Sequence, residues 1–423
     1  MIDIGKIYCG TTSTGDGLRY GTQAGPDCHG NAPHKIETSA NQRRPIVVWN
    51  ITRTCNLRCV HCYTDSENMK YSGELNTDEG LALIDSLADF GIPSLLFSGG
   101  EPLVRPDLFT LLEHAAKKGV RPVISTNGTL IDREAAQRIK DSGVVYVGIS
   151  LDGLEHVNDS FRGVEGAYKR TMNGFDSCRA VNQRVGLRLT LTRRNYIDLH
   201  GIFDFIEKEK INRACFYHLV YSGRGSSMYS DDLSHSESRN AMDIILERTS
   251  DYSRRNLDIN ILTVDNHVDG VYTYLKMKAK NHESADDVYR LLKWNGGAAN
   301  SSGVGIGDID FNGNVHPDQF WQDYTFGNVR DRNFGDIWMD ESDELMHGLK
   351  HKAEFIKGRC RLCQYKDLCT GSMRVRGFRA HGDAWAPDPQ CYLTDEEIGL
   401  DAEKKEYLKR NNEEFPVPDE LAR

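Results

Sequence analysis

Between residues 45 and 220, apolar and polar positions alternate between two kinds of pattern, one typical of strands and one typical of helices. Short runs rich in β-branched and aromatic residues alternate with longer segments whose apolar residues return every three or four positions. The short runs predict six strands, at 46–49, 94–97, 122–125, 144–150, 187–192 and 214–219. The longer segments predict helices at 77–90, 108–118, 131–142, 167–180 and 199–208.

Strict alternation of strands and helices predicts an α/β fold with a parallel sheet and right-handed crossovers, a partial (β/α)6 barrel. In such barrels the functional groups gather at the carboxyl ends of the strands. After the barrel, Asn312-Gly313 within 306–317 is a strong hairpin signal. We therefore expect a loop-rich segment (1–44), the barrel (45–220), a linking helical and strand region (221–298), a smaller domain (299–395) and a charged helical surface tail (396–423).

Three cysteines follow the first predicted strand in a C-x3-C-x2-C run: Cys55, Cys59 and Cys62, with Tyr63 directly after them. Three thiolates can hold three irons of a [4Fe–4S] cube and leave the fourth iron open to a small molecule. Two simpler readings are a zinc knuckle and three unrelated thiols. Zinc prefers four ligands, commonly from C-x2-C pairs, so the spacing favours the cluster.

Polar and glycine-rich turns follow the next three strands. The second strand ends in Gly99-Gly100-Glu101-Pro102, the third in Ser125-Thr126-Asn127-Gly128, and the fourth in Ser150-Leu151-Asp152-Gly153. Each could be ordinary turn chemistry. Their common place at strand ends, together with the cysteine run, predicts ligand contacts.

Four more cysteines, Cys360, Cys363, Cys369 and Cys391, lie near the end of the chain. Four thiolates can saturate either a [4Fe–4S] cube or a zinc ion.

Composition narrows the class of protein. The net charge of −10 argues against non-specific binding of nucleic acid, which needs a basic surface. No run of 18 apolar residues predicts a membrane span, and the first residues lack the pattern of a signal peptide, so we expect a cytoplasmic protein. In that compartment clustered cysteines are typical of metal ligands rather than of disulfides.

The cysteine run and the Gly-Gly-Glu-Pro turn together resemble radical S-adenosylmethionine (SAM) enzymes. The resemblance implies that the open iron takes the amino and carboxylate groups of SAM, and that one electron cleaves SAM to a 5′-deoxyadenosyl radical. It implies contacts to SAM from the turn after the second strand, with Glu101 at the methionine amino group, and from those after the third and fourth. The expected cofactor contacts are Tyr63, Gly99, Gly100, Glu101, Ser125, Asn127, Ser150 and Asp152. Arg162, further along, is expected either as a ligand or as a salt-bridged structural residue.

The C-terminal cysteines resemble the auxiliary-cluster region of the SPASM/twitch group of these enzymes. The full SPASM pattern has further cysteines around the hairpin, but here Asp318 follows the hairpin proline and no cysteine lies between Cys215 and Cys360. The resemblance therefore implies one auxiliary [4Fe–4S] cluster and two clusters in all. That cluster would relay an electron or brace the domain.

Stretches at 44–50, 215–225 and 381–397 resemble the radical SAM enzymes of alternative haem and haem d1 biosynthesis, which act on sirohaem derivatives. This branch implies the removal of two acetate side chains from 12,18-didecarboxysirohaem to give iron-coproporphyrin III, with an electron donor such as ferredoxin or flavodoxin. Alternatives are the removal of propionate groups on the haem d1 route, the decarboxylation of iron-coproporphyrin, a peptide-modifying maturase, and a cluster-bearing sensor without catalysis.

A large, flat substrate rich in carboxylates calls for an apolar slot with arginines at its rim. Each candidate has an ordinary alternative, a solvated charge for an arginine and a hydrogen-bonded core residue for a histidine. His218 is the first choice as an axial ligand to substrate iron or a proton donor. The candidates are Arg224, Arg374, Arg376 and Arg379, with His61, His218, His316 and His381. The segment 8–29 either folds over the active site or is partly disordered.

Overall fold

The computed structural model describes residues 1–11 and 44–422, and its strands form one sheet in the order β1-β8-β7-β6-β5-β4-β3-β2-β9-β10-β11. The strands are β1 (Ile2–Asp3), β2 (Ile46–Asn50), β3 (Ser94–Ser98), β4 (Arg121–Thr126), β5 (Tyr146–Ser150), β6 (Val185–Leu191), β7 (Arg213–His218), β8 (Asn260–Val264), β9 (Ile306–Ile309), β10 (Asn314–His316) and β11 (Gly327–Asn328).

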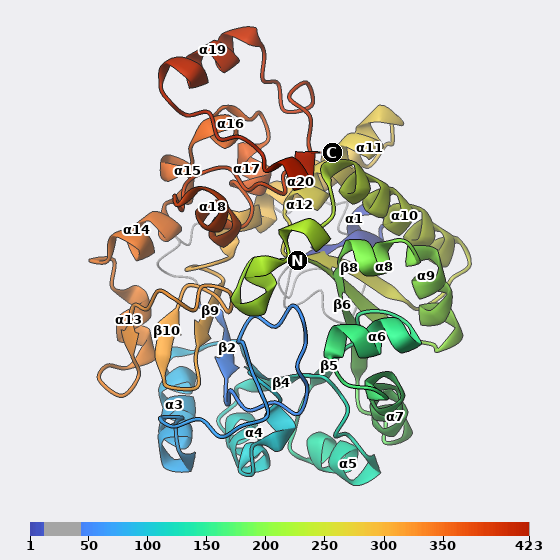
Figure 1. The fold of residues 1–423 in the computed structure, drawn as a ribbon, viewed down its shortest axis with the longest axis vertical. Helices are drawn as coiled ribbons and strands as arrows, with labels where there is room; N and C mark the ends of the chain where they lie inside the picture. The colour runs from blue at the N-terminus through green and yellow to red at the C-terminus, as the bar shows by residue number, and fades with distance from the viewer. Residues whose placement is uncertain (12–43, 423) are drawn as a thin grey trace.

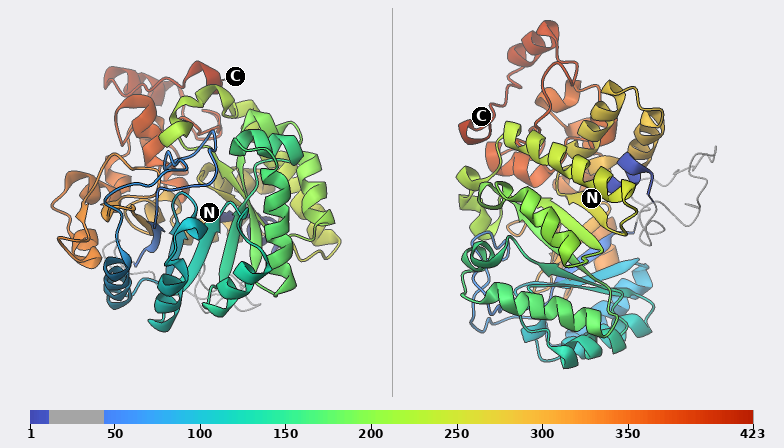
Figure 2. Two further views of the ribbon diagram at one scale, coloured as in Figure 1. Left: turned by 60° about the horizontal axis from the view of Figure 1, so that its bottom comes forward. Right: turned by 90° about the vertical axis from the view of Figure 1, so that its right-hand side faces the viewer.

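Strands β2 to β8 pair in parallel, each with the next in the chain. Figures 1 and 2 show them as a curved sheet with helices on its outer side. The predicted partial barrel is confirmed, and all six predicted strands occur in the predicted order. The strand β8 adds a seventh parallel strand beyond them.

Helices pack on the sheet through their apolar faces. Leu83, Ile84 and Leu87 of α3, for example, are buried in one core with Trp49 and Leu95 of the adjoining strands. The helices are α1 (Ile4–Cys9), α3 (Thr77–Phe90), α4 (Leu108–Lys117), α5 (Arg133–Asp141), α6 (Glu155–Arg162), α7 (Ala167–Ala180), α8 (Arg193–Tyr196), α9 (Leu199–Lys208), α10 (His235–Arg254), α11 (Val268–Ala279), α12 (Ala285–Asn295), α13 (Phe334–Met339), α14 (Glu344–Lys350), α15 (Lys352–Phe355), α16 (Gly358–Leu362), α17 (Lys366–Cys369), α18 (Arg374–His381), α19 (Ala402–Arg410) and α20 (Asp419–Ala422).

The sheet continues into the C-terminal region. The strand β9 pairs in parallel with β2, with Ile306 opposite Ile46, and then turns back into β10. The predicted hairpin is confirmed, and Gly313 in its turn has a φ of 87°, which glycine adopts at little cost. The sheet thus spans the expected boundaries at 221 and 299, and those boundaries stay a prediction.

Both ends of the described chain make contacts that were not expected of a loop and a surface tail, although α19 is the charged, mostly exposed helix expected in that tail. At the start, β1 pairs antiparallel with β8, and α1 follows it. At the other end, α20 returns to the barrel, where Leu421 is fully buried beside Phe161 and Tyr221. A single apolar residue in a charged segment has no periodicity that would predict this contact. The segment 8–29 lies mostly outside the described residues.

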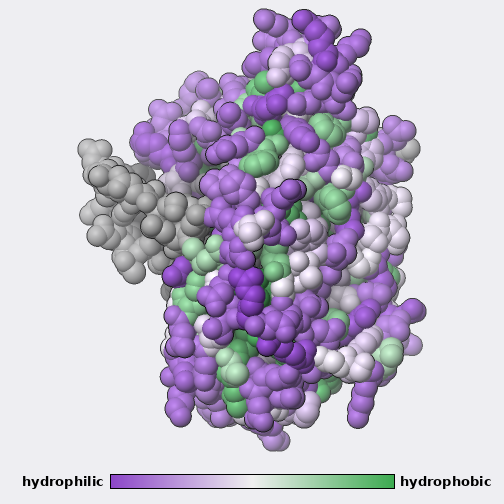
Figure 3. All heavy atoms as spheres, turned by 90° about the vertical axis from the view of Figure 1, so that its left-hand side faces the viewer, coloured by the Kyte–Doolittle hydropathy of each residue, from purple (hydrophilic) through white to green (hydrophobic). Residues whose placement is uncertain are grey.

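The two remaining observations concern one face of the molecule and the character of its helices. The face drawn in Figure 3 is largely hydrophilic, and its apolar side chains occur in small separate groups. Among the described residues, no helix has both the length and the apolar character that crossing a membrane would require.

Candidate active site

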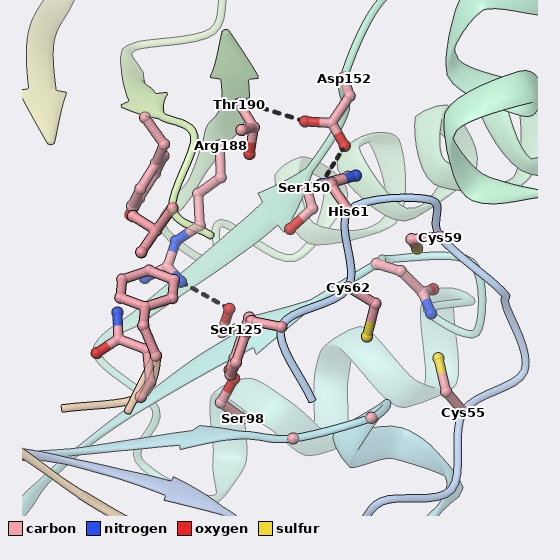
Figure 4. A pocket seen from close by; sticks show the side chains of 18 of the residues that line it. Cys55, Cys59, His61, Cys62, Ser98, Ser125, Ser150, Asp152, Arg188 and Thr190 are labelled. Carbon is pink, nitrogen blue, oxygen red and sulfur yellow. Dashed lines mark hydrogen bonds and ion pairs between the residues drawn. The ribbon is translucent and has the colours of Figure 1, made fainter. Parts of the chain in front are cut away.

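One cavity opens at the carboxyl ends of the barrel strands, and the three cysteines of the early run face it (Figure 4). It encloses about 1130 Å³ free of protein atoms, counted out into the open solvent at its mouth. Its lining residues come from the cysteine loop, from the carboxyl ends of several strands and, with Gln319 and Phe320, from the region that follows the C-terminal hairpin.

Two of these cysteines, Cys55 and Cys59, are held as thiols in the protein alone. Burial raises the pKa of Cys55 to about 12, and the nearby Glu101 carboxylate raises it further. Burial also raises the pKa of Cys59, although Arg162, whose Nη1 lies 3.5 Å from Cys59 Sγ, opposes that rise. A cation held by these sulfurs would reverse this, because a coordinating thiol loses its proton outright.

The two glycines after β3 let that turn press against the cysteine loop. A Cβ on Gly99 would come within 2.4 Å of Thr52 O, and one on Gly100 within 2.2 Å of Thr54 O. Instead, Gly100 N donates to Thr52 O (2.7 Å) and Glu101 N to Thr54 O (3.0 Å). These glycines therefore let the turn after β3 approach the backbone of the cysteine loop closely.

The Glu101 side chain holds the neighbouring turn. Its carboxylate is fully buried and accepts hydrogen bonds from Thr126 Oγ1 (2.7 Å) and from the backbone N of Asn127 (2.8 Å) and Leu103 (3.1 Å). Burial raises its pKa, an effect that these donors oppose. The side chain of Asn127 in turn donates to Asn56 Oδ1 in the cysteine loop (2.9 Å). Whether Glu101 also meets SAM stays a prediction.

Asp152 ties the cysteine loop to the barrel. One carboxylate oxygen accepts from Thr190 N (2.8 Å), and the other lies 3.2 Å from His61 Nε2 and in an ion pair with Arg162. Burial opposes ionisation, yet Arg162 and His61 hold the pKa of Asp152 below its usual range. Arg162 therefore has the structural ion pair that was one of its two expected roles.

Arg224 also braces the cysteine loop while it lines the cavity. Its Nε donates to Cys59 O (2.8 Å), its backbone N donates to Cys62 O (2.9 Å), and Nη1 pairs with Asp65 (2.7 Å).

Tyr63 connects the cavity to the C-terminal hairpin. Its hydroxyl donates to Asn50 Oδ1 (3.0 Å) and lies 2.9 Å from Ser98 Oγ. Asn50 Nδ2 then donates to Asp308 of β9 (2.9 Å), whose pKa burial raises to about 7. A chain of hydrogen bonds thus links the sheet extension to the residue that follows the third cysteine.

The other predicted site residues separate into two groups. Ser125, Ser150 and His218 line the cavity, and His218 Nε2 lies 3.0 Å from Asp269 Oδ2. The remaining candidates do not line it. His316 contacts Tyr324 O, Arg376 pairs with Asp388 in full burial, Arg374 donates to backbone carbonyls, Arg379 pairs with Asp323, and His381 packs edge-on against Phe415.

Several cavity residues were not among the predicted site residues: Arg188, Thr190, Tyr217, Asp265, Gln319 and Phe320. Strand alternation could have pointed to Arg188, because it lies between Leu187 and Leu189 of β6 and therefore faces the opposite side of the strand from these buried leucines. Gln319 and Phe320 reach the cavity from beyond the hairpin, and local sequence carries no signal for that.

The four C-terminal cysteines also come together. Cys360, Cys363, Cys369 and Cys391 line a second, smaller cavity with Arg359 at its wall. Burial raises the pKa of Cys360 to about 12 and that of Cys363 to about 11, and the neighbouring cysteines add to both shifts.

Known proteins resemble this chain along most of its length. Residues 49–206 match the model of the Radical SAM superfamily. The sequence is 51% identical to Fe-coproporphyrin III synthase of Methanosarcina barkeri (strain Fusaro / DSM 804), covering 94% of this chain and 99% of that one. It is 38% identical to pre-heme d1 synthase of Dinoroseobacter shibae (strain DSM 16493 / NCIMB 14021 / DFL 12), covering 84% and 88%. This chain belongs to the radical SAM superfamily.

The fold agrees with this assignment. The crystal structure of Streptococcus suis SuiB bound to S-adenosylmethionine matches this radical SAM enzyme with a TM-score of 0.65 at 20% identity, over 83% of this chain and 78% of that one. At that identity the likeness concerns the fold alone.

Membership of the superfamily brings SAM and a [4Fe–4S] cluster to this radical SAM enzyme. The cavity fits that pair, because its three thiols, one buried and two half-buried, lack a fourth cysteine partner among the residues that line it. Cys55, Cys59 and Cys62 would hold the cluster. Bound there, SAM and the cluster supply one-electron chemistry, and the chain contributes the buried, braced loop that positions them.

Proposed function

We propose that this enzyme is an Fe-coproporphyrin III synthase, which removes two acetate side chains from 12,18-didecarboxysirohaem. The observation that carries the proposal is the 51% identity to Fe-coproporphyrin III synthase over nearly the full length of both chains. The lower identity to pre-heme d1 synthase, 38%, makes the removal of propionate groups the second candidate.

The cavity supports a bulky substrate beside the cofactors. Apolar and aromatic residues, among them Val48, Leu96, Tyr217 and Phe320, share its wall with the polar groups. A flat tetrapyrrole needs both, an apolar slot for the macrocycle and cationic or hydrogen-bonding groups for its carboxylates. His218 is the proposed histidine at this substrate, whereas His316 and Arg376 are engaged elsewhere in the protein.

We further propose that Cys360, Cys363, Cys369 and Cys391 hold one auxiliary [4Fe–4S] cluster. Among these four described cysteines, no three sulfurs lie mutually within 4.8 Å of one another. Four zinc–sulfur bonds of about 2.3 Å in a tetrahedron would bring all four sulfurs closer than that. The wider spacing suits the larger cube.

The test is a reaction under anaerobic conditions. The reconstituted enzyme is incubated with SAM, dithionite and 12,18-didecarboxysirohaem, and the porphyrin and 5′-deoxyadenosine are followed by mass spectrometry. We expect loss of two acetate groups together with formation of 5′-deoxyadenosine. Loss of propionate carbons instead would establish the second candidate. An unchanged porphyrin beside 5′-deoxyadenosine would reject both substrates and retain the radical chemistry.

A further inference from the structure

Arg188 projects from the middle of the barrel wall into the cavity. It lies on β6, beside Ser150 on one neighbouring strand and Cys215 on the other. Figure 4 shows its guanidinium pointing toward Ser125, on the side of the cavity away from Cys55, Cys59 and Cys62. The cation thus faces the part of the cavity that the cysteine loop leaves open.

The Arg188 side chain is half-buried, and its guanidinium has few hydrogen-bond partners. Among the described residues it has one hydrogen-bond acceptor, Ser125 Oγ, at 2.6 Å from Nη1. Its Nε is buried without a hydrogen bond. No carboxylate of the described residues forms an ion pair with it, Asp265 in the same cavity included. Tyr217 and Tyr146 beside it are neutral, because burial raises the pKa of both phenols.

The other arginines near the cavity differ in this respect. Arg162 pairs with Asp152, Arg224 with Asp65, and Arg376 with Asp388. Arginine stays charged at any physiological pH, and an unpaired charge is costly to bury. An anion that enters the cavity would offset this cost.

The neighbouring strand is shaped around Arg188. A Cβ on Gly148 of β5 would come within 2.3 Å of Arg188 Nε and 2.9 Å of Cζ. The guanidinium carbon also lies 5.9 Å from the centre of the Tyr217 ring, within reach of a cation–π contact. The space left by Gly148, the hydrogen bond to Ser125 and the ring of Tyr217 together hold the Arg188 guanidinium in one orientation.

We propose that Arg188 binds a carboxylate of the tetrapyrrole substrate and so orients the macrocycle in the cavity. This inference rests on the proposed function. The carboxylate could come from an acetate or propionate side chain of the substrate or from the methionine part of SAM. The substrate is favoured because the SAM carboxylate is expected at the open iron beside the cysteines, away from Arg188.

The test separates the two sources by measuring two affinities. Anaerobically reconstituted wild-type enzyme, Arg188→Gln, Arg188→Lys and Gly148→Ala are titrated with 12,18-didecarboxysirohaem, followed by its visible absorption, and separately with labelled SAM in equilibrium dialysis. We expect Arg188→Gln to weaken substrate binding by about tenfold to a hundredfold, as for loss of a charge-assisted hydrogen bond, and to leave SAM binding unchanged. Arg188→Lys should fall between them, and Gly148→Ala should weaken substrate binding by displacing the fork.

Arg170→Gln is the matched control, because Arg170 is exposed on α7 away from the cavity, and it should behave as the wild type. Weaker SAM binding with unchanged substrate binding would assign Arg188 to SAM and overturn the inference. Unchanged affinities for both would make the arginine structural and also overturn it. If the wild type itself fails to bind the tetrapyrrole, the proposed function fails first, and the inference fails with it.

Discussion

The carboxylate of Asp152 is the point at which the cysteine loop is fastened to the barrel. It is 1% exposed and holds Arg162 and His61 from one side while it accepts the backbone N of Thr190 from the other. Buried ion pairs add little net stability, but removing one partner strands the other charge. Asp152 therefore fixes geometry more than it adds free energy of folding.

Asp152→Asn should lower the free energy of unfolding by about 3 kcal/mol, because it leaves the buried Arg162 without its carboxylate. The measurement is urea unfolding of the anaerobic reconstituted enzyme. Asp176→Asn is the control, since Asp176 pairs with Arg179 on an exposed helix surface and such pairs contribute at most about 1 kcal/mol. Equal shifts in the two variants would contradict the role given to Asp152.

At the residue scale, the sequence could predict which residues lie at the cavity but not which groups their side chains contact. The cysteines, Ser125, Ser150 and Asp152 all line the cavity, because the ends of parallel strands meet at one edge. Glu101 and Asn127 are also expected to contact SAM; their side chains form hydrogen bonds within the protein, Asn127 lines the cavity, and both SAM contacts stay a prediction. Motif spacing does not distinguish a side chain that contacts a ligand from one that positions the turn beside it.

At the scale of elements, the turn after β3 acts as the support of the cysteine loop. Its backbone lies so close to Thr52 and Thr54 that neither Gly99 nor Gly100 leaves space for a side chain. The cysteine loop, the turn and the Asn127 turn are thereby joined into one unit, through Glu101 on one side and Asn56 on the other.

Gly100→Ala should displace the cysteine loop, because its new Cβ would meet Thr54 O at 2.2 Å. We expect a lower iron content after reconstitution and a loss of 5′-deoxyadenosine formation, while the protein stays folded by circular dichroism. Gly119→Ala is the control. Its Cβ would meet nothing within 4 Å, although its φ of 80° adds backbone strain of roughly 1–2 kcal/mol. Normal iron content in Gly100→Ala would refute the supporting role of this turn.

Sequence predicts elements well where local signals coincide. The helix at 77–90 has exactly the predicted bounds, because Asn76 and Glu79 form a capping box at its start and Gly91 ends it in the left-handed region. The sheet edges were not predicted in the same way. The strand β1 has two residues, and the pairing of β9 with β2 joins segments about 260 positions apart by register (Ile46 to Ile306), so no local pattern could reveal either.

At the scale of the whole molecule, two cysteine groups occupy separate cavities. The cavity at the strand ends and the one around Cys360 share no lining residue. The sheet extension β9-β10 lies next to β2, and Asp308 on it connects through Asn50 to Tyr63 beside the first group. The two cysteine groups thus share no cysteine and no cavity. The sheet extension is nevertheless connected to the first group by hydrogen bonds.

A double variant, Cys363→Ser with Cys391→Ser, should therefore remove one cluster and leave the other. We expect iron and sulfide per polypeptide to fall by about half, since four-cysteine ligation is needed to saturate a cube. SAM cleavage with dithionite should persist, because Cys55, Cys59 and Cys62 lie in the other cavity. Cys178→Ala, at a buried helical cysteine outside both groups, should keep the full iron content. If the double variant also keeps full iron, or loses zinc in its place, the proposed auxiliary cluster is wrong.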